Sequence, residues 1–296
     1  MVAYVVEALD KVALACGEPL KSMDWMSPFV WRQDDALHLM MRGVPNPLGS
    51  TDPTGIIWCG TSSDGLNFDM DEKPAIEPGP AAASAGGVED PTVQPTADGL
   101  MVYYTGVDAR REQGSLLVAT GPDLLHLKER QIMLKAPEGE GNIKEATLAQ
   151  ASDGSWRLFY EYARDQASRI GMATAPDLGG EWRVVDDPFG IRKEGWDNWH
   201  LSTGPIVTVP GHDPVMFYNG ATIDARWRIG WVSFDAGFTR VTGRGIEPVL
   251  MPPPAEDRTE TDIAFAASAL VEGDTVQLYY SLEDRRLARA TIRVYG

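Results

Sequence analysis

Acidic residues recur at matching positions along this chain, and they are the side chains best suited to chemistry. Asp90 and Glu145 each open a short strand-like segment, and each lies eight residues before an Asp-Gly pair. Ser27 stands eight residues before Asp35 in the same kind of segment. Carboxyl groups held close together raise one another's pKa, so one retains a proton while another stays ionised. Cleavage of a glycosidic bond requires such a pairing of an acid with an anion.

The segments that carry these residues belong to a unit that recurs five times, about every 60 residues. Each copy has a short strand, a polar Gly/Asp turn, a strand dense in aromatic and aliphatic residues, and a third strand. The first strands are expected to begin at residues 27, 90, 145, 204 and 264. The third strands are expected over residues 55–61, 115–120, 169–174, 228–233 and 287–293.

Five copies of an antiparallel unit with little helical periodicity predict an all-β fold, a five-bladed β-propeller. A β-sandwich also has short regular strands, but it does not repeat one unit five times. We expect a single domain over residues 1–296, with insertions at 78–87 and 252–261. The fifth copy lacks an obvious outer strand, and the N-terminal stretch 3–8 is expected to supply it and close the ring.

The propeller prediction brings the recurring positions together in space. The first strand of each blade lines the central channel, so Ser27, Asp90, Glu145 and Gly204 should meet at one mouth, with Asp262 just upstream of the fifth copy. Taken singly, each acid also fits a strand cap or a turn residue. Their shared position favours a common acidic cleft.

The amino-acid composition excludes some classes of binding partner for this cleft. The formal charge of −17, from 43 acidic and 26 basic residues, would repel a nucleic acid. The sequence contains no run of about 18 apolar residues, so no membrane-spanning segment is expected. The two cysteines, Cys16 and Cys59, form neither a disulfide framework nor a metal-binding pattern. We therefore expect a cytoplasmic protein with an oligosaccharide substrate, no metal and no cofactor.

Several segments of the sequence resemble those of a known family. The segment 87–91, Gly-Val-Glu-Asp-Pro, is similar to the Gly-x-Glu-Asp-Pro segment of glycoside hydrolase family 130. That family comprises mannoside phosphorylases and mannosidases built on a five-bladed propeller. Further segments agree in order between residues 25 and 290: 39–42, 104–108, 144–146, 204–206, 217–220 and 278–284.

The resemblance implies a role for individual residues. Asp90 would be the general acid, passing its proton through a sugar hydroxyl, and Arg42 and Asp262 would hydrogen-bond the sugar in the cleavage subsite. The other residues that we expect at the substrate are Ser27, Asp108, His200, Tyr218, Asn219 and Asp284.

The chain departs from the family pattern where phosphorylases use basic residues to bind phosphate. A His-Arg pair is replaced by Tyr160-Glu161, a Lys by His200, a His by Asn219 and an Arg by Thr92. A carboxylate such as Glu161 would repel a phosphate dianion and could instead activate water. The departures favour an inverting hydrolase, with Glu161 or Glu145 as the base.

Three alternatives remain open on the sequence. The first is an inverting mannoside phosphorylase that uses inorganic phosphate. The second is an arabinanase- or sucrase-like propeller, against which Ser27 counts because those enzymes carry an Asp at that position. The third is a catalytically inactive carbohydrate-binding propeller, for which nine Trp and nine Tyr would offer stacking surfaces.

Overall fold

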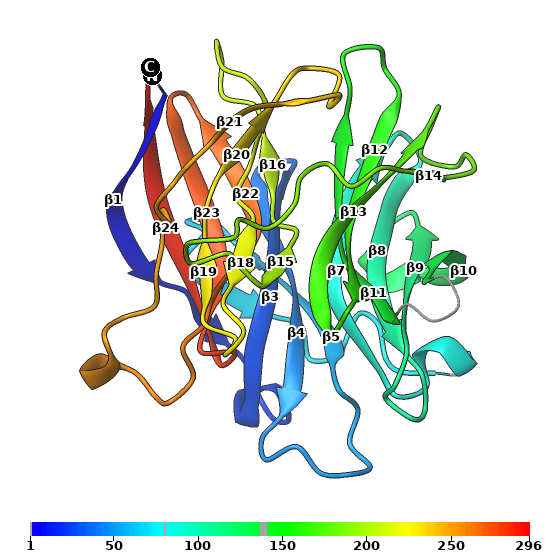
Figure 1. Cartoon of the computed structure of the whole chain (residues 1–296). Helices are drawn as coiled ribbons and strands as arrows, with labels where there is room; N and C mark the ends of the chain where they lie inside the picture. The colour runs from blue at the N-terminus through cyan, green and yellow to red at the C-terminus, as the bar shows by residue number, and fades with distance from the viewer. Residues whose placement is uncertain (1, 80, 137–140) are drawn as a thin grey trace.

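The computed structural model describes residues 2–79, 81–136 and 141–296, and almost all of its regular structure is β-strand (Figure 1). Each expected copy forms an antiparallel blade of the ring. The innermost strands are β3, β7, β11, β15 with β16, and β22, and each lies beside the innermost strand of the next blade. The last, β22, lies beside the first, β3, so the ring is closed. The prediction of an all-β, five-bladed propeller is confirmed.

The strands follow the expected order along the chain. The first blade contains β2 (Ala13–Ala15), β3 (Met23–Gln33), β4 (Ala36–Pro45), β5 (Ile56–Ser62) and β6 (Asn67–Met70). The second contains β7 (Gly87–Thr96), β8 (Gly99–Val107), β9 (Gly114–Gly121) and β10 (Lys128–Lys135). The third contains β11 (Gly141–Gln150), β12 (Trp156–Arg164), β13 (Ala167–Ala175) and β14 (Arg183–Val185).

The fourth and fifth blades complete the ring. The fourth contains β15 (His200–Ser202), β16 (Ile206–Val207), β17 (Val215–Met216), β18 (Asn219–Ala221), β19 (Trp227–Ile229), β20 (Val232–Phe234) and β21 (Val241–Arg244). The fifth contains β22 (Ala264–Glu272), β23 (Thr275–Leu282), β24 (Arg286–Tyr295) and β1 (Ala3–Lys11). Short 3₁₀ helices lie in the connections, at η1 (Leu20–Ser22), η2 (Ala82–Ser84), η3 (Leu124–His126) and η4 (Ala255–Asp257).

The N-terminal strand joins the two ends of the ring. Figure 1 shows β1, drawn in blue, beside β24, drawn in red, and the two pair antiparallel along their length. The chain then crosses to the first blade, where β2 pairs parallel with β6. The fifth blade therefore contains strands from both ends of the described chain, which ties the first blade to the last.

The apolar core is divided among the interfaces between blades. Five buried clusters lie one at each interface, because both faces of the second strand in a blade are covered by a neighbour. In β8, Tyr103 packs towards the third blade and Tyr104 towards the first. This two-sided burial explains why these strands read as continuous apolar runs rather than as an alternating pattern.

The fourth blade is interrupted in the middle of its strands. Gly204 and Pro205 separate β15 from β16; a Cβ on Gly204 would lie 1.9 Å from the carbonyl oxygen of Phe217. Backbone bonds from Phe217 N to Pro205 O (3.0 Å) and from Gly230 N to Tyr218 O (2.9 Å) bridge the halves. The expected third strand over residues 228–233 is accordingly split into β19 and β20.

Candidate active site

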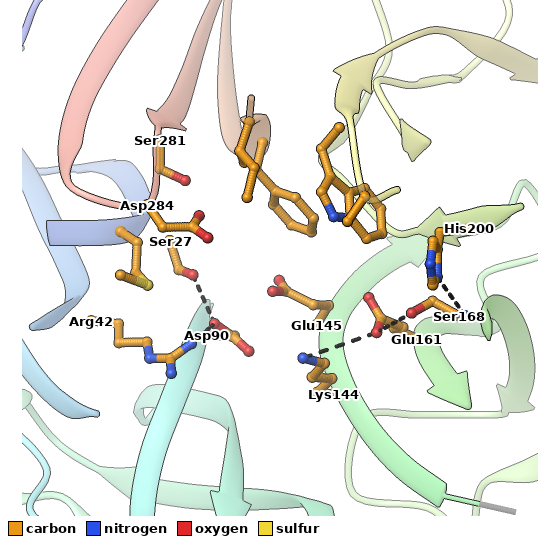
Figure 2. A pocket seen from close by; sticks show the side chains of 15 residues that line it. Ser27, Arg42, Asp90, Lys144, Glu145, Glu161, Ser168, His200, Ser281 and Asp284 are labelled. Carbon is orange, nitrogen blue, oxygen red and sulfur yellow. Dashed lines mark hydrogen bonds and ion pairs between the residues drawn. The ribbon is translucent and has the colours of Figure 1, made fainter. Parts of the chain in front are cut away.

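A cavity of about 230 Å³ lies where the innermost strands begin (Figure 2). It is lined by Met26, Ser27, Arg42, Asp90, Lys144, Glu145, Glu161, Ser168, His200, Ala225, Trp227, Ile263, Phe265, Ser281 and Asp284. All five blades contribute to this lining. The expected convergence of Ser27, Asp90 and Glu145 is observed, although these residues are far apart in the chain.

A repeated backbone feature aims these three side chains. Ser27, Asp90 and Glu145 have φ angles of 51°, 52° and 54°, in the left-handed region that non-glycine residues rarely adopt. Each sits in a β-bulge, where the pairing of the first and second strands of its blade shifts by one residue. A bulge re-aims a side chain, and its left-handed conformation costs about 1–2 kcal/mol. The surrounding structure therefore holds all three in a strained geometry, as is common at functional sites.

Hydroxyl groups beside the bulges fix this geometry by donating to carbonyl groups of a neighbouring blade. The donors and acceptors are Thr92 and Ala146 (2.6 Å), Thr147 and Gly204 (3.1 Å), Ser268 and Pro28 (2.7 Å), and Thr203 and Glu145. The openings of the innermost strands are thus cross-linked around the channel.

Asp90 stands on one side of the cavity. Its Oδ1 accepts a hydrogen bond from Ser27 Oγ (2.7 Å) and lies 3.8 Å from Arg42 Nη1. Its Oδ2 is buried and has no hydrogen-bond partner. Arg42 is fixed by Glu89 (2.7 Å) and by the carbonyl of Thr54 (2.7 Å). The free oxygen of Asp90 leaves one acceptor site for an incoming group.

Glu161, on β12, stands on the other side. Its Oε1 accepts a hydrogen bond from Ser168 Oγ (2.8 Å) and lies 4.0 Å from Lys144 Nζ. The charge of Glu161 raises the pKa of Lys144 despite its burial, which keeps the ammonium group charged. His200 accepts the main-chain N–H of Ser168 at Nδ1 (3.1 Å), and burial lowers its pKa. A neutral His200 therefore carries its proton on Nε2.

Glu145 lies between these two groups in Figure 2. Burial, with the charges of Asp90 and Glu161, raises its pKa well above the usual range, and Lys144 and Arg42 only partly oppose this. Burial also raises the pKa of Asp284, which lines the same cavity. Glu145 and Asp284 therefore hold protons more tightly than ordinary carboxylic acids do.

An aromatic wall faces these polar groups, and its Trp227 and Phe265 are not among the residues expected at the substrate. The rings of Trp227 and Phe265 lie 5.2 Å apart edge to face, and His200 lies 5.5 Å from Trp227. Such a wall suits the apolar face of a sugar ring. Phe265 occupies the start of the fifth innermost strand, which is the signal that would have found it. Lys144 and Ser168 were also missed, although Lys144 directly precedes Glu145.

Four residues expected at the substrate lie outside the cavity. Asp108 accepts main-chain N–H groups in its own turn, and Tyr218 is buried, donating to Asp197 (2.7 Å). Asn219 is fully buried and bonds to main-chain groups of Thr203 (2.6 Å) and Ala266 (2.7 and 3.0 Å).

Asp262 is the fourth, and it is held between two arginines, Arg228 at 2.7 Å and Arg258 at 3.1 Å. These four residues do not line the cavity, and their contact with substrate stays a prediction. Tyr218 and Asn219 are fully buried in the fourth blade and do not line the cavity. The remaining expected residues, Ser27, Arg42, Asp90, Glu145, Glu161, His200 and Asp284, line it together.

The donor set of the cavity does not form a metal site. Across residues 2–79, 81–136 and 141–296, no group of three or more His, Cys, Asp and Glu side chains is arranged to hold an ion. Over the same residues, no helix is long and apolar enough to cross a membrane.

The fold and the cavity together define a five-bladed propeller with an acidic site at one mouth of its channel. Residues 49–295 match the sequence model of glycoside hydrolase family 130, described as beta-1,4-mannooligosaccharide phosphorylase, and the chain belongs to this family. It is therefore set apart from the arabinanase- and sucrase-like propellers.

Individual relatives agree with this assignment. A beta-1,2-mannobiose phosphorylase of Listeria innocua is 29% identical over 245 residues, covering 79% of this chain and 65% of that protein. The structure of the beta-1,2-mannobiose phosphorylase from Listeria innocua in complex with beta-1,2-mannobiose has a TM-score of 0.75 at 20% identity, covering 97% of this chain and 91% of that one.

A further solved structure bears on the chemistry of the family. It is described as showing that the GH130 family of mannoside phosphorylases contains glycoside hydrolases that target beta-1,2 mannosidic linkages in Candida mannan. Its TM-score is 0.75 at 22% identity, covering 91% of this chain and 84% of that one. At this identity the likeness establishes the shared fold.

Proposed function

We propose that this protein is an inverting hydrolase of β-mannosides, with Asp90 as the general acid and Glu161 as the base that activates water. The observation that carries the proposal is the position of Glu161 in the cavity, opposite Asp90 and beside Lys144. An inverting glycosidase needs two carboxyl groups on opposite faces of the sugar, with room for water beside one of them.

The surroundings of Asp90 suit proton delivery. Ser27 and Arg42 hold one carboxylate oxygen, while the buried Oδ2 has no partner. A buried polar oxygen without a partner is unfavourable, so a sugar hydroxyl placed beside Oδ2 gains a strong hydrogen bond. As the general acid, Asp90 would hold its proton on Oδ2 and donate it to this hydroxyl, which in turn passes its own proton to the glycosidic oxygen.

The surroundings of the two glutamates favour Glu161 over Glu145 as the base. Glu161 has a hydroxyl donor in Ser168 and a cation in Lys144, both of which stabilise a carboxylate. Glu145 is instead buried beside the charges of Asp90 and Glu161, and its raised pKa favours the protonated form. A protonated carboxyl group cannot take a proton from water, so Glu145 is assigned to binding and to the electrostatics of the site.

The carboxylate of Glu161 supports hydrolysis over phosphorolysis. Of the four carboxyl groups that line the cavity, those of Glu145 and Asp284 hold their protons more tightly than usual, and the two cations in the lining are Arg42 and Lys144. Both cations are already engaged by Glu89 and Glu161. A unit negative charge about 4 Å from Glu161 would be disfavoured by about 4 kcal/mol at an effective dielectric of 20.

The test is to incubate the purified enzyme with β-1,2- and β-1,4-linked manno-oligosaccharides, with and without inorganic phosphate. We expect free mannose in both cases, first released with inverted anomeric configuration, and a large loss of kcat in Glu161→Gln. Release of mannose 1-phosphate that depends strictly on added phosphate would contradict hydrolysis.

Phosphorolysis is the second candidate, and the comparisons favour it specifically. The matching family model is described as a phosphorylase, and so is the Listeria innocua relative. In that case Lys144 and Arg42 would have to release their carboxylate partners to bind phosphate. The same incubation distinguishes the two reactions by their product.

A further inference from the structure

A second depression adjoins the catalytic cavity and has no role in the reaction described above. This groove, of about 520 Å³, shares two lining residues, Ala225 and Ile263, with the cavity. Its other lining residues come from the β18–β19 hairpin and from the segment before β22. The catalytic cavity of about 230 Å³ is smaller than the roughly 300–1,000 Å³ typical of ligand sites, so the groove is a natural continuation.

The walls of the groove are tied together by specific bonds. Trp227 N donates to Asp262 O (3.1 Å), which joins the hairpin to the segment before β22. The carboxylate of Asp262 then bridges Arg228 (2.7 Å) and Arg258 (3.1 Å), and all three side chains are largely buried. Because Trp227 also forms the aromatic wall of the cavity, the groove and the cavity share one rigid partition.

The charges of the groove balance overall. Arg226 pairs with Asp224 at 2.7 Å on the open side, Asp262 pairs with Arg228 and Arg258 below, and Glu260 supplies the third acid. A site of balanced charge does not select an anion or a cation. It offers many N–H donors beside carboxylate acceptors, since each guanidinium group carries five N–H bonds. Vicinal hydroxyl groups of a neutral sugar can satisfy both kinds of group at once.

We propose that this groove binds the part of a neutral oligosaccharide that lies beyond the bond being cleaved, so that the enzyme prefers chains longer than a disaccharide. This inference rests on the proposed function of the neighbouring cavity. It also gives Asp262 a place in substrate recognition outside the cleavage subsite, as the group that positions the arginines of the groove.

The experiment measures binding by calorimetry in an Asp90→Asn background, which removes turnover during the titration. The probes are a disaccharide and a tetrasaccharide of mannose in each linkage, β-1,2 and β-1,4. Two added hydrogen bonds of ordinary net strength correspond to roughly tenfold tighter binding of the longer chain. Adding Arg226→Ala should reduce this ratio at least about threefold, because the exposed side of the groove loses its donors.

A matched control comes from the far end of the innermost strands. Arg32 pairs with Glu272 at 3.4 Å and is 53% exposed, much like Arg226 at 61%, but it lies at the end of β3 remote from Ser27. Arg32→Ala should leave the ratio unchanged. Thermal unfolding of each variant checks that the fold is intact.

The outcomes separate the inference from the proposed function. Equal affinity for the two chain lengths, or a ratio that Arg226→Ala does not alter, would overturn the inference while cleavage by the wild-type enzyme leaves the proposed function standing. Tighter binding of the tetrasaccharide by an enzyme that cleaves no mannoside would support the groove and overturn the function. Absence of binding to every probe would overturn both.

Discussion

Asp90 and Glu145 reach the same cavity from equivalent bulges, yet their carboxyl groups have different neighbours. Asp90 has a hydroxyl donor and a nearby guanidinium group, whereas Glu145 has burial and two other carboxylates around it. The same kind of β-bulge therefore presents Asp90, which has hydrogen-bonding partners, and Glu145, which is strongly desolvated. Environment rather than residue type separates their roles, as in other glycosidases.

Asp90→Asn tests the general acid at the scale of one residue. Because Asn tolerates the left-handed conformation of Asp90, the fold should be kept. We expect kcat/KM for an unactivated mannoside to fall about 10²–10⁴-fold, since general acid catalysis is worth that much. Circular dichroism and thermal unfolding serve as controls. A wild-type protein with sugar affinity but no activity would instead identify a carbohydrate-binding propeller.

Glu145→Gln tests the protonation of the buried acid. The folded-state pKa of Glu145 lies above its unfolded value of about 4.5, so its contribution to stability is fully present below that pH. It is lost as the pH rises through the folded-state pKa, because the deprotonated group is then buried at a cost. The stability of Glu145→Gln relative to wild type should therefore increase between about pH 5 and about pH 8.

Urea unfolding at both pH values measures this difference. Asp284 also has a raised pKa, but it is present in both proteins and its contribution largely cancels. A difference that stays constant with pH would show that Glu145 titrates as an ordinary exposed glutamate.

At the scale of elements, the innermost strands were the most predictable part of the molecule. Ser27, Asp90 and Glu145 each lie at the same distance in sequence from the turn that follows. This offset is visible in the sequence because the length of the hairpin and the position of the bulge are the same in each copy. All five hairpin turns between first and second strands lie where the Gly and Asp residues predict them.

The rest of the site depends on register and on strand interruptions, which leave little trace in a single sequence. Ser168 approaches Glu161 because β13 pairs with β12, and His200 approaches Ser168 because β15 lies beside β13. Trp227 is one of many aromatic residues, most of which pack between blades. The polar side chain of Asn219 in a buried strand reads as functional in the sequence, and its main-chain partners are visible only in the structure.

Asn219→Ala tests the structural role of that residue. Its side chain satisfies two carbonyl groups and one N–H group between the fourth and fifth blades, all of them buried. Buried groups left without partners cost about 1–3 kcal/mol each, so we expect a loss of at least about 3 kcal/mol in the free energy of unfolding. Asn67→Ala, at an exposed hydrogen bond to Asp64, is the control and should change stability far less. Loss of activity at unchanged stability would restore Asn219 to the substrate site.

At the scale of the whole molecule, stability is distributed over the interfaces between blades. No blade has an apolar core of its own in the described structure, because each of the five clusters draws on two neighbours. β1 completes one of these interfaces, where Tyr4 lies 5.4 Å from Phe217 and 4.9 Å from Trp231. The ring should therefore unfold as one cooperative unit.

Tyr4→Ala tests this closure. Removal of a half-buried aromatic side chain with two ring contacts should lower the free energy of unfolding by about 2–3 kcal/mol. A calorimetric scan should still show a single transition at lower temperature. Tyr295→Ala, at an exposed tyrosine on the adjacent strand, is the control. A separate early transition would indicate that the fifth blade melts independently.

The cavity is bordered by residues from every blade, and this has a mechanical consequence. A sugar bound as proposed would contact Asp90, Glu161, Trp227 and Asp284 together, and it would add contacts across the interfaces between blades. A bound glycan would therefore stabilise the contacts between all the blades that it touches. Ligand binding in the cavity and the stability of the folded ring are then thermodynamically linked. An inactive variant saturated with its ligand should resist heat and proteases better than the same variant without ligand.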